Sequence, residues 1–374
     1  MSNLKFVNIK KKVVFIEKKF KNSNFLFFTL IPILFYLGHR SPIAFDEGYY
    51  ILQSKFIILK NDWIAPRFFE RLVLDRTLTL QSLLAISQKL FGNNIFFIYF
   101  PNMISGIIML FLTFKIHIEL IGKKYAILSP LILATTFLWV NYYHMATQDI
   151  IFSTLITFGV YSTLKAYKTK KNIYFLLCGL WIGLGFSLKT YLIAIPLVAI
   201  LPFLKYSKII FSKYFWIGTL IGFFPFLIWS YKVINIYEFG TYKGLYEKLI
   251  KLSGENTFTK PFYYYCWNLI LNCFPWSLFS VIGFINNFKL KSKITNYFLG
   301  LYPLIIMILL SIFSTKTPYY PIQILSIVSI NSYSGIIYIF SNKNIINKWF
   351  NFLNFIILSI ILFSIIIYFY KMEN

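Results

Sequence analysis

The sequence predicts an all-α membrane protein with about 11 transmembrane helices, within a range of 9–13. Hydrophobic residues make up 58% of the 374 residues. Charged residues make up only 13%, whereas a soluble domain usually carries about 25%. Eleven apolar runs come close to the length of about 20 residues that a helix needs to cross a bilayer. Lys and Arg also gather in alternate turns between these runs, as expected of a protein that crosses a membrane repeatedly.

The apolar runs account for most of the chain outside two long loops. The four runs between residues 125 and 205 are the shortest, so their helices can be tilted or broken. The candidate spans are residues 22–38, 95–114, 125–141, 150–166, 173–188, 190–205, 214–232, 264–286, 295–313, 319–340 and 349–370.

The charges in the turns predict how the helices are oriented. With the N-terminus inside and the spans alternating, the inside segments hold 22 of the 37 Lys and Arg residues and only two of the 12 acids, Glu17 and Glu119. The positive-inside rule predicts this bias. We therefore expect a multi-pass protein of the plasma (inner) membrane with a cytoplasmic N-terminus and a periplasmic outer face. The net charge of +25 then reflects topology and contact with anionic membrane lipids, so nucleic acid is not an expected partner.

We expect one integral membrane domain over residues 1–374, with no soluble C-terminal domain. It comprises a basic cytoplasmic N-terminus (1–21), a first outer loop (39–94) and a second outer loop (233–263). Apolar residues at helical spacing over 47–60 and 77–91 predict amphipathic helices on the membrane surface. Residues 242–252 predict a third such helix.

Four positions at the outer ends of the spans carry the chemistry that the sequence offers. Asp46-Glu47 follows the first span, Asp149 begins the fourth, and Lys189 and Lys316 lie in short outer turns. Each has a structural alternative, because carboxylates cap helices and lysines anchor helix ends at the interface. Together they suit transfer from a lipid phosphate. Cations stabilise charge on a leaving phosphate, and a carboxylate takes the proton of an acceptor hydroxyl.

The sequence names no cofactor. It holds no P-loop, GxSxG or HExxH motif, and its histidines and cysteines lack the spacing of metal ligands. Carboxylates near a phosphate can share a divalent metal ion without any sequence signature, so metal dependence stays open.

Short segments between residues 30 and 325 follow one another in a specific order. They are Asp46-Glu47 with Tyr49-Tyr50, Asn61 to Pro66, Asp75-Arg76, Gln148-Asp149, Leu188 to Thr190, Pro261 to Tyr265 with Pro275-Trp276, and Lys316 to Pro321. In order, spacing and expected outer location they resemble the motifs of the polytopic lipid-phosphate-sugar glycosyltransferases. That superfamily includes the protein O-mannosyltransferases and the lipid A aminoarabinose transferase. Two departures are Thr77, where the family often has proline, and Thr190, where it has glycine.

The resemblance implies a site on the outer face, with Asp46 as the catalytic base. Arg76 and Lys189 would bind the lipid phosphate, with Lys316 as a third cation. Asp149 would orient these cations or the sugar, as would Asp75. The substrate-binding residues that the resemblance implies are Glu47, which serves as a structural partner, Asp75, Arg76, Asp149, Lys189, Lys316 and Tyr320.

The leading hypothesis is therefore a cell-envelope glycosyltransferase. It would move a hexose or pentose from a polyprenyl phosphate to a lipid, glycan or protein acceptor, with inversion at the anomeric carbon. Protein glycosylation and lipid A modification are both compatible with this chemistry. A transporter or lipid flippase is the main alternative, and a non-catalytic assembly subunit is the third. A transporter predicts internal repeats and ionisable residues near the bilayer midplane, whereas the ionisable residues of this sequence gather at span ends.

Overall fold

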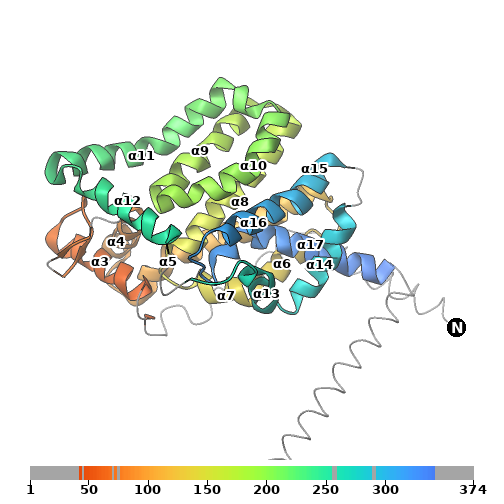
Figure 1. Cartoon of the computed structure of the whole chain (residues 1–374), viewed down its shortest axis with the longest axis horizontal. Coiled ribbons are helices and arrows are strands. Elements are labelled where there is room, and N and C mark those ends of the chain that lie inside the picture. The colour runs from red at the N-terminus through yellow and green to blue at the C-terminus, as the bar shows by residue number, and fades with distance from the viewer. Residues whose placement is uncertain are drawn as a thin grey trace, which may run out of the picture.

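The computed structural model describes residues 42–43, 46–69, 71–73, 76–254, 259–288 and 292–341. The predicted spans 22–38 and 349–370 lie outside these residues. The described chain folds into packed helices (Figure 1). The α-helices are α3 (Asp46–Lys60), α4 (Thr79–Phe91), α5 (Ile95–Leu120), α6 (Leu128–Ala134), α7 (Phe137–Tyr143), α8 (Gln148–Thr169), α9 (Asn172–Lys189), α10 (Ala194–Tyr206), α11 (Lys213–Tyr237), α12 (Gly240–Ser253), α13 (Tyr264–Asn272), α14 (Trp276–Phe288), α15 (Lys293–Asn296), α16 (Tyr302–Ile312) and α17 (Leu325–Ser341).

Short irregular elements connect these helices. Two-residue strands β1 (Arg67–Phe68) and β2 (Arg71–Leu72) pair antiparallel in the first long loop. The 3₁₀ turns η2 (Thr190–Ile193), η3 (Ile209–Phe211) and η5 (Tyr320–Ile324) precede α10, α11 and α17, and the π-helical turn η4 (Tyr297–Leu301) joins α15 to α16.

The described residues contain six stretches that are long and apolar enough to cross a membrane, or up to seven if the bent pair α13–α14 counts as one span. The six are Ile95–Leu120, Gln148–Thr169, Asn172–Tyr206, Lys213–Tyr237, Lys293–Ile312 and Tyr320–Ser341. The prediction of an all-helical membrane protein is confirmed, but a count of eleven spans is not shown.

The predicted span at 125–141 differs most from the structure. It forms α6 and α7, which have seven residues each, and a helix of that length is too short to cross a bilayer alone. The break falls at Thr135 and Thr136. The N–H groups of both threonines donate back to carbonyls of α6, and the extended backbone of Thr136 separates α6 from α7.

The stretch Asn172–Tyr206 reverses direction at η2. At the end of α9, Lys189 contacts Asp149 in the first turn of α8. Near the end of α10, the ring of Phe203 lies 5.5 Å from that of Tyr167, close to the other end of α8. Helices α9 and α10 therefore run antiparallel to each other beside α8.

Glycines allow α9 and α11 to pack at very short range. Gly179 and Gly183 of α9 face Gly218 and Gly222 of α11. A Cβ atom on Gly222 would lie 2.2 Å from the carbonyl oxygen of Leu180, which leaves no room for a side chain. Small residues at this spacing are typical of helix contacts in a bilayer, where close backbone approach supplies much of the attraction.

Hydroxyl groups join α5, α8 and α17 in the interior. Thr113 of α5 donates to Ser326 Oγ of α17 at 2.8 Å, and Thr157 of α8 lies 3.2 Å from the same oxygen. All three residues are buried. Buried hydroxyls that find partners on neighbouring helices fix how those helices face each other.

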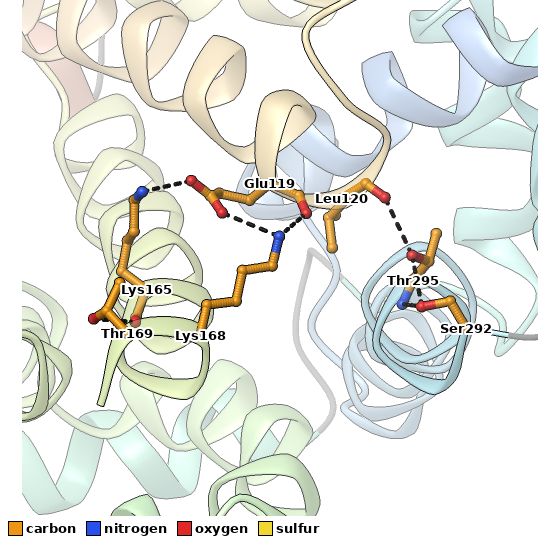
Figure 2. Close-up of polar contacts among 7 residues, drawn as sticks. All are labelled: Glu119, Leu120, Lys165, Lys168, Thr169, Ser292 and Thr295. Carbon is orange, nitrogen blue, oxygen red and sulfur yellow. Dashed lines mark hydrogen bonds and ion pairs between the residues drawn. The ribbon is translucent and has the colours of Figure 1, made fainter. Parts of the chain in front are cut away.

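Charged groups join the helices at the end of α8 remote from Asp149, which we call the Glu119 end (Figure 2). Glu119 of α5 accepts from Lys165 Nζ at 2.6 Å and Lys168 Nζ at 3.1 Å, both on α8. The Thr295 hydroxyl of α15 donates to the carbonyl of Leu120 at 3.2 Å. Glu119, Leu120, Lys165 and Lys168 belong to turns that the charge pattern predicts to lie inside, and Thr295 begins the predicted span that follows another such turn.

The amphipathic helices predicted at 47–60, 77–91 and 242–252 are present as α3, α4 and α12. Helices α3 and α4 pack together through glutamines, with Gln81 Nε2 donating to Gln53 Oε1 at 2.8 Å. In Figure 1, α12 runs from the end of α11 back towards the centre of the molecule. This path brings α12 over the end of the bundle where Asp149 and Lys189 meet, which we call the Asp46 end.

Candidate active site

Glu47 fastens the start of α3 to the loop that precedes α8. Its side chain is only 1% exposed. One carboxylate oxygen accepts from the N–H of Ile43 at 2.6 Å, and the other accepts from the N–H of Ala146 at 2.9 Å. The neighbouring Asp46, the first residue of α3, is exposed. Glu47 therefore ties the start of α3 to the segment before α8, and it holds Asp46 near the helix that begins with Gln148.

Lys189 and Asp149 form a buried ion pair between the end of α9 and the start of α8. Their side chains meet at 2.5 Å, and each is 9% exposed. The Lys189 ammonium also lies 5.4 Å, 5.8 Å and 5.6 Å from the ring centres of Phe152, Tyr319 and Tyr320. Aromatic faces attract a cation at such distances, so the ammonium is held from several sides.

Arg76 lies beside two tyrosines that follow the Asp46-Glu47 motif. Its guanidinium carbon is 4.8 Å from the ring centre of Tyr49 and 5.5 Å from that of Tyr50. A flat guanidinium stacks well on aromatic faces. The motif of α3 thus positions a cation that is remote from it in the sequence.

The segment that carries Arg76 is tied to the end of α9. The Thr79 hydroxyl donates to the carbonyl of Ser187 at 2.5 Å, and the Thr77 hydroxyl donates to the carbonyl of Leu188 at 3.5 Å. Threonine at 77, where the family often has proline, therefore contributes a contact that proline would lack. These bonds bring Arg76 close to Lys189.

A cavity of about 130 Å³ opens at the Asp46 end. Among the described residues, its lining contains three cations from separate elements: Arg76 before α4, Lys189 of α9 and Lys248 of α12. Its walls are mainly apolar. Leu188, Leu192, Ile195, Leu245, Leu249 and Phe313 lie in these walls, together with Tyr191 and Tyr320. Cations next to apolar walls suit a phosphate that carries a hydrocarbon chain.

A smaller space of about 10 Å³ lies next to this cavity and shares Lys189 and Tyr320 with it. It is also lined by Asp149 and Tyr319. Asp46 lines neither space within the described part of the chain. It is joined to them by Tyr319, whose hydroxyl donates to Asp46 Oδ2 at 3.3 Å.

Lys316 lies next to Thr315, which lines the larger cavity, but its own ammonium is bound elsewhere. It is 3% exposed, and its ammonium donates to the backbone carbonyls of Lys260 at 3.0 Å and Phe313 at 2.5 Å. Burial lowers the pKa of this lysine. Lys316 is not among the residues that line the two spaces. In this structure it ties the loop before η5 to the segment before α13.

Asp75 lies outside the described residues. Among the residues that the structure describes, no three His, Cys, Asp or Glu side chains lie close enough together to hold a metal ion.

Lys248 lines the cavity but was not among the residues predicted from the sequence. Leu245, Lys248 and Leu249 share one face of α12 at helical spacing, which was the available signal.

Two residues of the motif segments, Asn61 and Thr190, adopt a positive φ in this chain. Asn61 has φ 50°, in a region that asparagine tolerates better than most residues. Thr190 has φ 45° and ψ −116°, which glycine adopts easily and a β-branched residue adopts only under strain. Thr190 therefore holds a conformation that favours glycine, the residue that the family has at this position.

Comparisons with known proteins agree with the motifs. Residues 75–231 match the family described as dolichyl-phosphate-mannose-protein mannosyltransferase. The undecaprenyl phosphate-α-4-amino-4-deoxy-L-arabinose arabinosyl transferase of Wigglesworthia glossinidia brevipalpis is 27% identical over 319 residues, which are 78% of this chain and 54% of that protein. The transferase of the same name from Shewanella sediminis is 24% identical and covers 92% of this chain. The chain spans about half the length of the curated relatives it matches.

Solved structures share the fold. ArnT from Cupriavidus metallidurans bound to undecaprenyl phosphate superposes with a TM-score of 0.73 at 16% identity, covering 83% of this chain and 59% of that one. The archaeal oligosaccharyltransferase AglB from Archaeoglobus fulgidus gives a TM-score of 0.57 at 11% identity, covering 90% of this chain and 52% of that one. In its ordered motifs, its relatives and its fold, the chain is similar to the polytopic lipid-phosphate-sugar glycosyltransferases.

Proposed function

We propose that the protein transfers a sugar from a polyprenyl-phosphate donor to an acceptor hydroxyl or amine at the Asp46 end. The observation that carries this proposal is the cavity in which Arg76, Lys189 and Lys248 meet apolar walls. Several curated relatives are named for a donor that joins 4-amino-4-deoxy-L-arabinose to undecaprenyl phosphate. We propose the same class of donor for this chain, a pentose on a C55 polyprenyl phosphate, and modification of a lipid A-like acceptor.

The cations would act on the leaving group. As the bond between the anomeric carbon and the phosphate oxygen breaks, negative charge collects on the polyprenyl phosphate. Arg76, Lys189 and Lys248 would neutralise that charge through charge-assisted hydrogen bonds. Asp149 would hold the Lys189 ammonium in place beside the cavity. Phosphate bound in this way leaves easily, so the reaction requires no acid to protonate it.

Asp46 would act on the acceptor. The acceptor hydroxyl or amine forms the new bond to the anomeric carbon, and its proton passes to the Asp46 carboxylate. Attack from the side opposite the phosphate inverts the anomeric configuration. Exposure of Asp46 fits an acceptor that arrives from outside the bundle, while the phosphate lies in the cavity beyond Tyr319.

The remaining predicted residues take supporting roles. Glu47 would fix the start of α3, Tyr320 would form the wall between the two spaces, and Asp75 would orient the cations. The bonds of Lys316 favour a role in holding the loop before η5 and not in binding phosphate. The concentration of Lys and Arg in the turns of the Glu119 end favours a cytoplasmic location for that end and a periplasmic one for Asp46.

Asp46→Asn tests the proposed function. The purified protein would be given undecaprenyl phosphate carrying radiolabelled 4-amino-4-deoxy-L-arabinose, with an envelope extract of its own cells as the acceptor source. We expect the parent protein to release undecaprenyl phosphate and label the extract, and Asp46→Asn to lose this activity while it still binds undecaprenyl phosphate. Transfer by Asp46→Asn at the parent rate would remove Asp46 as the base.

A further inference from the structure

Tyr319 is the described side chain that joins Asp46 to the donor side of the site. Its hydroxyl donates to Asp46 Oδ2 at 3.3 Å. Its ring lies 5.8 Å from the ammonium of Lys189 and 5.2 Å from the ring of Tyr142. It also lines the small space that contains Asp149. The hydroxyl therefore lies at the boundary between the exposed carboxylate and the buried ion pair.

The Tyr319 hydroxyl is suited to donate a hydrogen bond because its surroundings favour the protonated form. Tyr319 immediately precedes the span that begins at Tyr320. Burial raises its pKa first of all, and the charges of Asp149 and Asp46 raise it further. A phenol that stays protonated cannot act as a base, and its proton can only be directed at an acceptor. Asp46 provides that acceptor.

The Tyr319 hydroxyl restrains a carboxylate that is exposed at the start of α3. The backbone of α3 is fixed at its start, where Glu47 accepts from Ile43 and Ala146. This contact places the Cα atom of Asp46 but not its exposed carboxylate. A hydrogen bond to Oδ2 restrains the carboxylate and leaves Oδ1 to receive a proton.

We propose that Tyr319 is a positioning residue, which orients the Asp46 carboxylate towards the acceptor and couples it to the Lys189–Asp149 pair. The proposal rests on the proposed function. It adds a residue that the motif comparison did not single out, since Tyr320 was the tyrosine expected at the site. The coupling follows from the ring, which packs on the donor side while its hydroxyl reaches the base. A movement of Lys189 on binding phosphate would therefore shift the Tyr319 ring and, with it, the hydrogen bond to Asp46.

Tyr319→Phe tests this role because it removes the hydroxyl and keeps the ring. The transfer assay with labelled undecaprenyl-phosphate aminoarabinose and envelope extract would give kcat and the KM for the donor. Binding of undecaprenyl phosphate alone would be measured separately. We expect kcat to fall about tenfold, as for loss of one hydrogen bond to a charged group. Donor KM and undecaprenyl phosphate affinity should stay within about twofold of the parent values.

Tyr263→Phe is the matched control. It removes a tyrosine hydroxyl at the same end of the molecule, from a side chain that is 63% exposed. It should leave kcat and donor binding unchanged.

Three results would overturn the inference. An unchanged kcat in Tyr319→Phe, with an active parent protein, defeats the positioning role alone. Equal losses of kcat and undecaprenyl phosphate affinity, with a lower melting temperature, show a packing role instead. No transfer by the parent protein defeats the proposed function, and the inference with it.

Discussion

Two variants of the Lys189–Asp149 ion pair separate the effect of Lys189 on phosphate binding from its effect on the stability of the fold. Both side chains are 9% exposed and meet at 2.5 Å. Lys189 also lines the cavity, whereas Asp149 lines only the smaller space. Lys189→Met therefore removes a cation from the proposed phosphate site and leaves a carboxylate buried without its partner. Lys189→Met combined with Asp149→Leu removes the cation but leaves no orphaned charge.

The two effects have different magnitudes. Removing one member of a buried ion pair costs about 3–5 kcal/mol because the remaining charge is desolvated. Replacing both members with apolar groups is often neutral. Loss of a hydrogen bond from a charged group to phosphate costs about 1.5–3 kcal/mol, which weakens binding about 10- to 100-fold. The single variant should therefore lose stability and affinity, and the double variant should regain stability but not affinity.

The assay is thermal unfolding in lipid nanodiscs with increasing undecaprenyl phosphate. The melting temperature without ligand reports stability, and its rise with ligand reports affinity by linkage. Dodecyl phosphate serves as a second ligand, to separate binding of the phosphate from binding of the long chain. The reasoning fails if Lys189→Met melts at the parent temperature. It also fails if the double variant binds undecaprenyl phosphate as tightly as the parent does.

Three further predictions follow from the packing. Thr190→Gly should raise the melting temperature by relieving about 1–3 kcal/mol of backbone strain at φ 45°; a lower value would show that the threonine side chain contributes more than the strain costs. Gly222→Leu should prevent α11 from approaching α9 and reduce the yield of folded protein by size-exclusion chromatography, whereas Leu220→Phe, at a site 65% exposed, should not. Glu119→Gln should lower the melting temperature by weakening the ion pairs with Lys165 and Lys168, yet undecaprenyl phosphate affinity should not change, because these groups lie at the opposite end of α8 from Lys189.

The sequence predicted helices well where apolar composition and helix length coincide. The runs at 95–114, 150–166 and 214–232 correspond to α5, α8 and α11, although each helix extends beyond the apolar run. Helix α5 continues to Leu120 because charged side chains such as Glu119 find partners on α8 at the Glu119 end. Hydrogen bonding continues a helix past the membrane boundary, so an apolar window marks the span and not the whole helix.

Two predictions depended on information that composition does not contain. Residues 125–141 have the composition of a span, but local bonding at Thr135 and Thr136 ends one helix and begins another. Lys316 has the charge and location of a phosphate ligand, but its ammonium points to two carbonyls of its own surroundings. Motifs indicate which residue types gather at one end of a bundle. The direction of a side chain depends on which unpaired carbonyls lie within its reach.

Of the three cations at the proposed phosphate site, two could be predicted from the sequence and one could not. Arg76 and Lys189 could be assigned because each lies in a recognisable motif. Lys248 lies in no such motif, and on an isolated surface helix its charge would simply face water. Lys248 lines the proposed phosphate site because α12 follows α11 and lies over the end of the bundle. Leu245, which is 5% exposed, buries the same face of α12. A lysine that follows a buried leucine by three residues lies on the same side of the helix, so Lys248 and Leu245 line one cavity. An anionic lipid is the ligand we propose for it, because its phosphate would meet the lysine and its hydrocarbon chain the leucine.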